Sequence, residues 1–223
     1  MAEKLSNDQI IKALLDAAFF RSAGDTSLAN VADNLGIKKA SLYNHFESKQ
    51  DMMNKTTESC GEYINGINFI PNDVQGVAQR YPAETVLKGL VSRYVKMHEK
   101  DPLFQIYTFL ESQKFFDSNA AKLIEERNRR LVEQTETVLI ALFEHNKISI
   151  QKFQIHGAAV WFCAGMNDLL SSYLLARKEV VKQNPPSGEG ELFTLETDEE
   201  SIERINKFVE EFAVLLKHFQ AAN

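Results

Sequence analysis

The sequence predicts an all-α protein with about nine helices, in which a three-helix head precedes a larger helical body. Two observations lead to this prediction. Apolar residues recur three and four positions apart along most of the 223 residues, whereas no stretch shows the strict alternation of a half-buried strand. Helix caps, glycines and prolines divide this pattern into segments of helical length. With 44% apolar residues, the chain has enough material for a substantial core.

The first 55 residues are expected to form a three-helix domain with a helix-turn-helix, followed by a second domain over residues 56–223. Ser6 and Gln9 have the spacing of a capping box at the start of the first helix, which Gly24 is expected to end. Gly36 separates two further helices that are too short to be stable alone and must dock on the first. The three helices are expected at 6–22, 26–35 and 37–46.

The remaining helices are placed by their caps and prolines. Ser48, Asp101, Ser118 and a residue near Asp198 are expected to cap helices, and Pro82 and Pro102 are expected to be first helical residues. These helices are expected at 48–67, 82–100, 102–113, 118–143, 150–182 and 198–219. Residues 68–81 are ambiguous between a loop and a single helical turn. The sequence leaves open whether the loop 183–197 is ordered or lines a pocket.

Charge is spread unevenly along the chain. The net charge is −6, yet the first 55 residues contain seven Lys or Arg and seven Asp or Glu, so the body carries the whole excess. An acidic protein of this kind is not expected to bind nucleic acid over its whole surface. A neutral head on an acidic body is compatible with specific docking through a small local patch.

Several classes of protein are disfavoured by missing patterns. The sequence has no Gly-rich phosphate loop, no nucleophile elbow and no HExxH motif, and its five histidines are scattered, so no enzyme, metal site or cofactor is expected. Cys60 and Cys163 lack a CxxC pairing and are expected to be buried thiols, with a redox switch as the alternative. The longest apolar run, 158–166, falls short of the ~20 residues of a membrane span, and no signal-peptide region begins the chain, so a cytoplasmic protein is expected.

The outer face of the predicted helix 37–46 carries an unusual density of hydrogen-bond donors. Leu42 and Phe46 are one helical turn apart and are expected to face the first helix. The opposite side then presents donors and two cations, which suit a groove lined by phosphates. The alternative for Tyr43 and His45 is packing within the head. The donor-bearing residues are Lys38, Lys39, Ser41, Tyr43, Asn44 and His45.

Residues 1–55 closely resemble the DNA-binding domain of the TetR family of bacterial transcriptional regulators. The resemblance rests above all on Gly36-Ile-Lys-Lys-Ala-Ser-Leu-Tyr-Asn-His-Phe-Glu-Ser-Lys49, in which the Leu-Tyr-x-His-Phe-x-x-Lys spacing is specific. Beyond the head, only the length, the helical layout and an Ala-Gly-x-x-Asp-Leu pattern at 164–169 match. The resemblance therefore implies little about the chemistry of the body.

This resemblance implies a homodimer whose two recognition helices enter successive major grooves of a near-palindromic operator in double-stranded DNA. Lys can donate to guanine and Asn can bracket adenine, while hydroxyls at a helix start suit phosphate. By position, the residues implied near base edges are Lys39, Ala40, Ser41 and Asn44, with Ala29 close to the groove. The residues implied to hold phosphates are Thr26, Ser27, Tyr43, His45 and Lys49, and Lys38 suits either role.

The segments 150–178 and 198–219 are apolar on more than one side, so we expect them to form a four-helix interface across a two-fold axis. The alternative is that both are core helices of a monomer. Small residues along the first segment would let helices approach closely. The expected interface residues are Ala158, Phe162, Gly165, Leu169, Ser172, Tyr173, Ile205, Phe208, Phe212 and Leu216.

An excess of aromatic residues in the body, interleaved with a few polar ones, predicts a pocket for a small apolar or aromatic effector. The alternative is plain core packing, and His98 is expected to be a hydrogen-bonded interior histidine rather than a metal ligand. The candidate pocket residues are Tyr94, His98, Phe104, Tyr107, Phe109, Phe116, Trp161, Phe162 and Asn167.

The sequence therefore predicts a ligand-responsive, dimeric DNA-binding regulator that acts as a repressor. Effector binding would shift the helices near 82–115 and, through the linking helix 48–67, change the spacing of the two heads. The alternatives are an activator or ligand-independent regulator of the same fold, and an all-α interaction protein that does not read DNA. The effector, the operator and the regulated genes cannot be read from the sequence.

Overall fold

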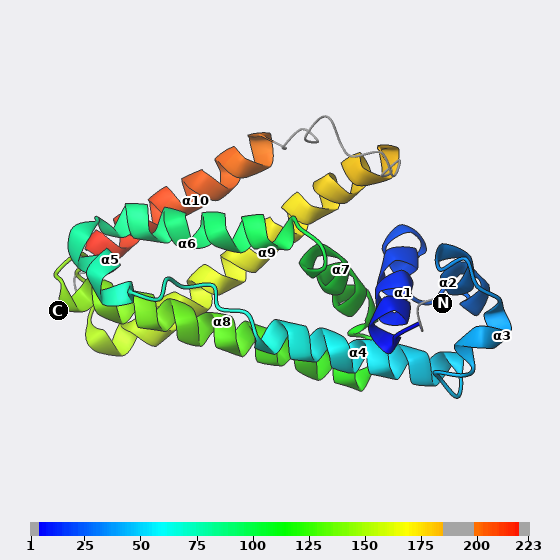
Figure 1. The fold of residues 1–223 in the computed structure, drawn as a ribbon. Coiled ribbons are helices and arrows are strands. Elements are labelled where there is room, and N and C mark those ends of the chain that lie inside the picture. Colours follow the sequence, from blue (N-terminus) through cyan, green and yellow to red (C-terminus); the bar gives the residue numbers. More distant parts are fainter. Residues whose placement is uncertain (1–4, 185–198, 219–223) are drawn as a thin grey trace. The chain divides into compact units, whose positions relative to one another are not determined.

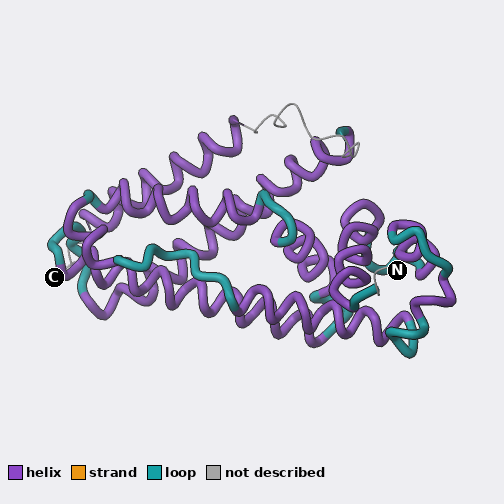
Figure 2. The backbone as a smooth tube through the Cα atoms, viewed as in Figure 1, coloured by secondary structure: helices purple, strands orange, loops and turns teal. Residues whose placement is uncertain are grey.

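A computed structural model describes residues 5–184 and 199–218 and confirms the all-α prediction. Within these residues the chain forms ten α-helices and one short 3₁₀ helix, and no strand (Figures 1 and 2). The first helices are α1 (Asn7–Arg21), α2 (Leu28–Asn34), α3 (Lys39–Leu42), α4 (Lys49–Asn65) and α5 (Val74–Arg80). The others are α6 (Ala83–His98), α7 (Leu103–Gln113), α8 (Ser118–Glu144), η1 (Lys152–Gln154), α9 (Ile155–Gln183) and α10 (Glu199–His218).

The predicted start of α1 is confirmed, and its end at Arg21 lies one residue before the expected 22. The Ser6 hydroxyl accepts a hydrogen bond from the Gln9 amide at 3.2 Å, and the Gln9 side chain accepts one from the Ser6 amide at 2.8 Å. The helix ends at Arg21, and Ser22, not Gly24, takes the left-handed backbone conformation, with φ 115°. The chain turns at Ser22 because its carbonyl accepts hydrogen bonds from both the amide and the hydroxyl of Thr26.

The ambiguous stretch 68–81 contains a helix, which raises the count above the predicted nine. Asp73 caps α5 by accepting the Gly76 amide hydrogen bond at 2.9 Å. Pro82 and Pro102 flank their helices as N-caps rather than starting them. Ser118 is the first residue of α8, and the preceding carboxylate, Asp117, accepts the Asn119 amide at 2.8 Å. The expected cap Asp198 and the loop 185–198 lie outside the described residues.

The described residues pack as two compact units. The first comprises the residues up to Ile67 together with Lys100–Arg127, and the second comprises Asn68–Glu99 and the residues from Asn128 onward. The first unit therefore adds α7 and the start of α8 to the predicted head. This division groups residues by packing, so the functional boundary expected near residue 55 stays a prediction.

In the first unit, α7 packs against α1 and α4 and completes the core of the head. The Phe104 ring meets Phe19 of α1 edge to face, with centroids 4.8 Å apart. Beside it, the Gln105 amide donates a hydrogen bond to the Asp16 carboxylate. The Thr57 hydroxyl of α4 donates to Asp117 at 3.2 Å. Both apolar and polar contacts thus join α7 and its following turn to the helices of the head.

In the second unit, α10 packs against both α6 and α9, and Figure 1 shows α6 and α10 side by side. Phe162 of α9 lies between two aromatic rings of α10, with centroid distances of 5.5 Å to Phe208 and 4.6 Å to Phe212. Gly165 permits this contact, because a Cβ there would lie 2.6 Å from the Phe208 ring. The predicted close approach of helices at Gly165 is therefore made within one protomer.

A buried polar cluster links three helices of the second unit. The Tyr94 hydroxyl donates to the Asn167 side chain at 2.9 Å, and Asn167 donates to Asn128 at 3.2 Å. His98, only 1% exposed, lies 2.8 Å from the Tyr94 carbonyl through Nδ1 and stacks on Phe69. His98 is thus a hydrogen-bonded interior histidine, as predicted.

Both cysteines are buried free thiols, which confirms the prediction. Burial raises the pKa of Cys60 to about 12 and that of Cys163 to about 11. Because the thiolate is the reactive form, both side chains are inert near neutral pH. A redox switch through these two thiols gains no support from their surroundings.

Two helix-interior glycines of the second unit provide a matched test of this packing. A Cβ at Gly89 of α6 would have no neighbour within 4 Å, whereas one at Gly165 would clash with Phe208. Gly89→Ala should stabilise the protein by about 1 kcal/mol, since Ala favours a helix over Gly. Gly165→Ala gains the same propensity but must displace the Phe208 ring, at a cost of about 1–3 kcal/mol.

The free energy of unfolding, measured by urea titration at one fixed protein concentration, checks this prediction. Gly165→Ala should be the less stable variant of the two. Equal stabilities would contradict the close contact between α9 and α10.

Candidate nucleic-acid interface

The turn between α2 and α3 is held by hydrogen bonds that the sequence specifies locally. Ser27 caps α2, accepting the Asn30 amide at 3.2 Å, while Asn30 accepts the Ser27 amide at 2.9 Å. Gly36 has φ 64°, the left-handed conformation that glycine adopts without steric cost. The Ile37 amide then reaches back to the Ala32 carbonyl at 3.0 Å. The predicted helix break at Gly36 is confirmed.

The second helix of this pair is shorter than the predicted 37–46. Only Lys39–Leu42 is α-helical, and residues 43–45 continue as turns whose amides bond to carbonyls three residues earlier. Leu42 and Phe46, which are 1% and 3% exposed, anchor the segment in the core of the first unit. These two side chains face inward as predicted, so the other side of the segment faces outward.

That outward side carries most of the residues expected to meet DNA. Tyr43 is 53% exposed, so its ring does not fill the core and the packing alternative gains no support. Ser41 is half-buried beside it. The expected contact residues that the structure places at the surface are Ser27, Ala29, Lys38, Lys39, Ala40, Tyr43 and Asn44.

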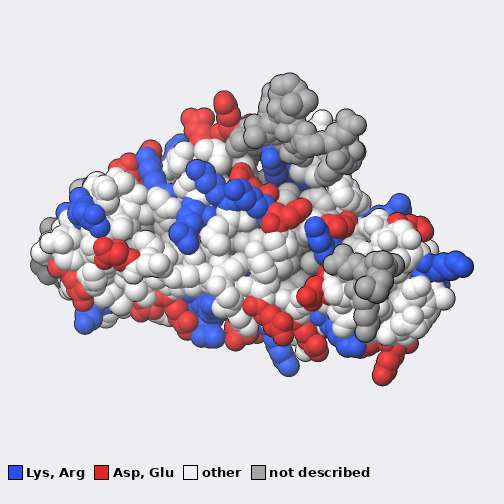
Figure 3. Space-filling view, in the orientation of Figure 1, with Lys and Arg blue, Asp and Glu red and all other residues white. Residues whose placement is uncertain are grey.

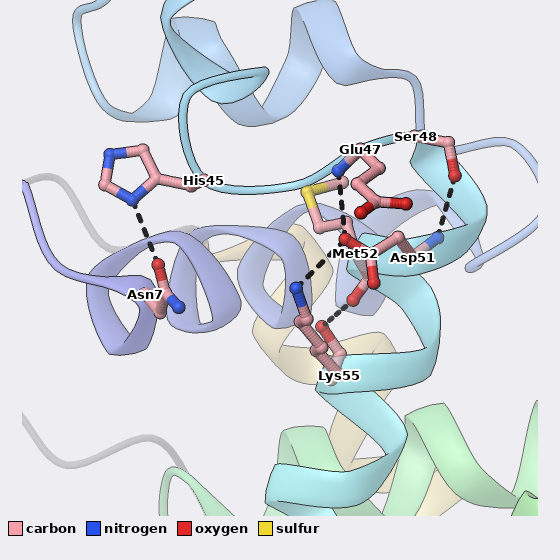
Figure 4. A network of polar contacts seen from close by, with 8 residues as sticks. Asn7, His45, Glu47, Ser48, Asp51, Met52 and Lys55 are labelled. Atoms are coloured by element: carbon pink, nitrogen blue, oxygen red, sulfur yellow. Dashed lines mark hydrogen bonds and ion pairs between the residues drawn. The ribbon is translucent and has the colours of Figure 1, made fainter.

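Besides the capping Ser27, three expected phosphate contacts are engaged in hydrogen bonds within the head. His45 is half-buried and lies 3.0 Å from the Asn7 side-chain oxygen (Figure 4). The Lys49 ammonium donates to the Gly24 carbonyl at 3.2 Å. Thr26 is only 1% exposed, and its hydroxyl donates to the Ser22 carbonyl at 2.6 Å. Thr26 therefore supports the turn after α1, and we do not retain it as a phosphate contact.

A carboxylate at the start of α4 ties down the turn that follows α3 (Figure 4). Asp51 accepts hydrogen bonds from the Glu47 amide and the Lys55 ammonium, both at 3.0 Å. Its own amide donates to the capping Ser48 hydroxyl at 3.0 Å, which confirms the predicted cap. The Glu47 hydrogen bond, followed by that of Lys55, lowers the pKa of Asp51. This role of Asp51 was not predicted from the sequence, although Ser48-x-x-Asp51 has capping-box spacing.

Acidic and basic side chains are interleaved on the face of the protein shown in Figure 3. A broad cationic surface is not visible there, so any contact with nucleic acid on this side would depend on a few placed side chains.

The residues expected at a dimer interface divide into buried and accessible sets. Phe162, Tyr173, Ile205, Phe212 and Leu216 are buried inside the second unit. Ala158, Gly165, Leu169, Ser172 and Phe208 retain at least partial exposure. The buried set therefore packs the protomer itself, which is the packing that the sequence analysis held as its alternative.

Large apolar side chains nevertheless remain exposed on η1, α9 and α10. We call them the outer apolar stripe: Phe153, Val160, Trp161, Leu175, Val214 and Leu215. Trp161 is 70% exposed and borders a hollow of about 490 Å³ between these elements. Most of this stripe was not predicted from the sequence, because a helix that is apolar on several sides does not reveal which side faces inward.

The expected pocket residues are divided between the two units. Phe104, Tyr107 and Phe109 are buried in the first unit, and Phe116 there is 86% exposed. Tyr94, His98, Phe162 and Asn167 belong to the second unit, where the first three are buried, and Trp161 lies in the outer apolar stripe. Among the described residues, no group of three or more His, Cys, Asp or Glu could hold a metal ion. No helix in this part of the chain is long and apolar enough to span a membrane.

Comparison with known families agrees with the resemblance seen in the head. Residues 10–56 match the family described as bacterial regulatory proteins, tetR family. The biofilm operon icaADBC HTH-type negative transcriptional regulator IcaR of Staphylococcus aureus is 35% identical over 60 residues, covering 27% of this chain and 32% of IcaR. The match thus spans about a third of the length of this curated relative.

Solved structures resemble the fold along nearly the whole chain. A putative TetR-family regulator from Mesorhizobium loti is 18% identical, covering 94% of this chain and 95% of its own, with a TM-score of 0.58. FadR from Bacillus subtilis in complex with stearoyl-CoA is 12% identical, with coverages of 97% and 100% and a TM-score of 0.56. A putative regulator from Saccharomonospora viridis in complex with choline is 13% identical, with coverages of 92% and 95% and a TM-score of 0.62. At these identities the similarity shows the fold alone.

The charge on Asp51 should make the stability of the head depend on pH. Its folded-state pKa is lowered, so the ionised carboxylate stabilises the fold above its ordinary value of 3.8. This contribution is lost as the pH falls through the lower folded value. Asp51→Asn should therefore be less stable than the wild type at neutral pH, and the difference should vanish once the pH is below the lowered folded value.

Thermal unfolding followed by circular dichroism across this pH range measures the difference. Glu58→Gln removes an exposed carboxylate from the same helix and should change stability less at neutral pH. A difference for Asp51→Asn that persists unchanged into acid would refute the role of its charge.

Proposed function

Residues 10–56 match the tetR family of bacterial regulatory proteins, and from this premise we propose that the chain is a homodimeric transcriptional repressor of that family. It would bind a near-palindromic operator in double-stranded DNA and leave it when a small apolar effector binds the body. The repressor form is favoured by IcaR, whose description is that of a negative regulator. Contact with DNA would place the protein in the cytoplasm.

The exposed side of the α3 segment is the observation that carries this proposal. The hydrogen-bond donors on this side belong to a short helical segment that Leu42 and Phe46 anchor in the core. A turn precedes the segment at Gly36, and a second turn, held by a hydrogen bond to Asp51, follows it. A pre-positioned row of this kind can enter a major groove without first being ordered. Packing does not require Lys39 or Asn44 at these positions, because both side chains are exposed and neither contributes to the core.

Within this proposal the surface residues divide by chemistry. Lys39 and Asn44 can make paired hydrogen bonds to guanine and adenine edges, and Ala40 and Ala29 allow close approach. The phenol of Tyr43, the hydroxyl of Ser27 and the ammonium of Lys49 suit phosphate oxygens. Ser41 stands at the base-edge side, His45 at the phosphate side, and Lys38 suits either.

Dimerisation would cover the outer apolar stripe. Soluble monomers rarely leave several large apolar side chains together in water, and exposed groups of this kind mark interaction sites. Trp161, Leu215 and the hollow beside them offer a self-complementary surface for a second copy related by a two-fold axis. Ala158, Gly165, Leu169 and Ser172, which lie along α9, remain proposed contacts at this surface.

Regulation would proceed through α4, which starts after the α3 segment and ends four residues before Phe69 of the second unit. Phe104 and Gln105 of α7 contact α1. A movement of α7 would therefore be a second way for a change to reach the head. An effector that binds one arrangement of these helices more tightly than another would shift the population of DNA-competent dimers. The ligands in the FadR and Saccharomonospora viridis structures support a small-molecule effector, but at low identity do not name it.

An activator of the same fold, a ligand-independent regulator and an interaction protein without DNA readout are the alternatives. The interaction protein without DNA readout is tested by letting the full-length protein select binding sites from random duplexes. We expect a palindromic sequence with two half-sites about one helical turn apart, or a multiple of it. Recovery of no common sequence would refute the DNA-binding proposal, and Asn44→Ala should relax the preference at one position of each half-site.

A phosphate contact and a base contact should differ in their dependence on salt. Lys49→Ala should weaken binding to all duplexes and reduce the slope of log affinity against log salt by about one per half-site contact. Fluorescence anisotropy with operator and random duplexes measures both effects. Lys217→Ala, which removes an exposed cation from α10, is the matched control and should leave the slope unchanged. An unchanged slope for Lys49→Ala would exclude its phosphate contact.

The outer apolar stripe should be required for the dimer. Trp161→Glu places a charge in the centre of the proposed interface, where its burial is unfavourable, and should give a monomer at micromolar concentration. Phe115→Glu changes an aromatic side chain that is 82% exposed in the first unit and should remain dimeric. Sedimentation velocity distinguishes the two, with circular dichroism confirming that each variant is helical. A wild-type monomer, or a dimeric Trp161→Glu variant, would overturn the proposed interface.

A further inference from the structure

A groove in the second unit is lined by none of the residues expected to bind an effector. It runs along α6 between α5, the segment that follows α4, and α8, and has a volume of about 280 Å³. Its lining residues outside α6 are Phe69, Pro71, Val77, Tyr81 and Val138. The groove is almost entirely apolar, and its size is at the lower end of that of small-molecule sites.

The face of α6 that lines the groove is unusual in having a glycine at its centre. Thr85, Gly89 and Arg93 follow each other at four-residue spacing on this face. Gly89 lies well inside α6, where glycine is less favourable than alanine by about 1 kcal/mol. No packing contact requires glycine there, because a Cβ would meet nothing within 4 Å. The missing side chain instead leaves the groove open.

A single cation stands at one end of this apolar groove. The Arg93 guanidinium donates one hydrogen bond, to the Asn68 carbonyl at 3.3 Å, and has no ion-pair partner among the described residues. Thr85 and the half-exposed ring of Tyr81 stand toward the other end. A rise of ~1.5 Å per residue puts Thr85 and Arg93 about 12 Å apart along the helix. The groove thus has a charged end and an apolar length.

From this arrangement we propose that the groove binds an amphipathic carboxylate of medium chain length, such as a fatty acid. The carboxylate pairs with Arg93, and the alkyl chain lies over Gly89 toward Tyr81. The bare backbone surface at Gly89 lets the chain approach α6, and burial of its methylenes supplies most of the affinity. Arg is suited to the head group because its guanidinium can donate two parallel hydrogen bonds to a carboxylate.

The groove has a direct connection to the buried cluster of the second unit. Phe69, which lines the groove, meets Tyr94 edge to face at 4.7 Å and stacks on His98 at 5.8 Å. Its amide is held by the Gln134 side chain at 2.7 Å. In sequence, Phe69 follows the end of α4 by four residues. A ligand against Phe69 therefore contacts the segment that continues from the linking helix, and its identification as the effector rests on the proposed function.

Calorimetric titration of the full-length wild-type protein with decanoate tests the binding site without DNA. We expect saturable binding that weakens about fourfold for each methylene removed, in the series from decanoate to octanoate and hexanoate. Decanol should bind more weakly than decanoate, because it lacks the carboxylate that pairs with Arg93. Decylamine should bind more weakly still, because its ammonium group is repelled by Arg93.

Two pairs of variants locate the ligand. Gly89→Leu fills the groove with a good helix former and should abolish decanoate binding without loss of stability, whereas Gly89→Ala should retain binding. Arg93→Gln should weaken decanoate by up to about fivefold and leave decanol unchanged. Absence of decanoate binding, or equal binding by wild type and Gly89→Leu, would overturn the proposal.

A separate measurement distinguishes the site from its role. Anisotropy with the selected operator should show release of DNA by decanoate from the wild type but not from Gly89→Leu. Binding with the expected variant profile but without release would support the site and reject its role as effector site. Failure to find any operator would refute the proposed function, whereas calorimetric binding of decanoate would still support the ligand site.

Discussion

The anchoring of a very short helix is the constraint on which the rest of this protein depends. Four helical residues, Lys39–Leu42, cannot hold a conformation alone, because helix nucleation costs more than one turn returns. Their orientation comes from burial of Leu42 and Phe46 and from turns tied at both ends, by Gly36 and by Asp51. These few interactions determine the position of every proposed DNA contact on this segment.

Polar contacts in the first unit extend this constraint to more distant parts of the chain. Lys49 and Thr26 both hydrogen-bond to the turn that follows α1, and Gln105 of α7 bonds to Asp16 of α1. The net contribution of a single hydrogen bond to stability is modest, so these bonds fix relative positions more than they add stability. The head is therefore not an independent three-helix domain in its packing, since α7 and the start of α8 complete its core.

The second unit divides its apolar surface among three uses. One part forms the protomer core, as in the contact of Phe162 with Phe208 and Phe212. A second part, the outer apolar stripe, remains exposed and is suited to a second copy of the chain. A third part lines the groove at Gly89, where a missing side chain keeps space open. Dimerisation and ligand binding would thus draw on different faces of the same unit.

Local features were determined by the sequence alone, because they depend on residues only a few positions apart. The capping pair Ser6 and Gln9, the break at Gly36 and the cap at Ser48 are of this kind, and so is the inward direction of Leu42. The fold class and the recognition segment followed from them. The helix α5 was only suggested, since its seven residues carry no clear apolar period.

Burial was decided by the tertiary structure, because it depends on helices far away in the sequence. Thr26 reads as a surface hydroxyl but bonds to the carbonyl of Ser22 beneath it. Phe104 and Phe109 read as pocket residues but fill the core of the first unit. In α9, which is apolar on several sides, only packing against α10 buried Phe162 and left Trp161 exposed. Periodicity shows that a helix has apolar sides, whereas its neighbours determine which of them water can reach.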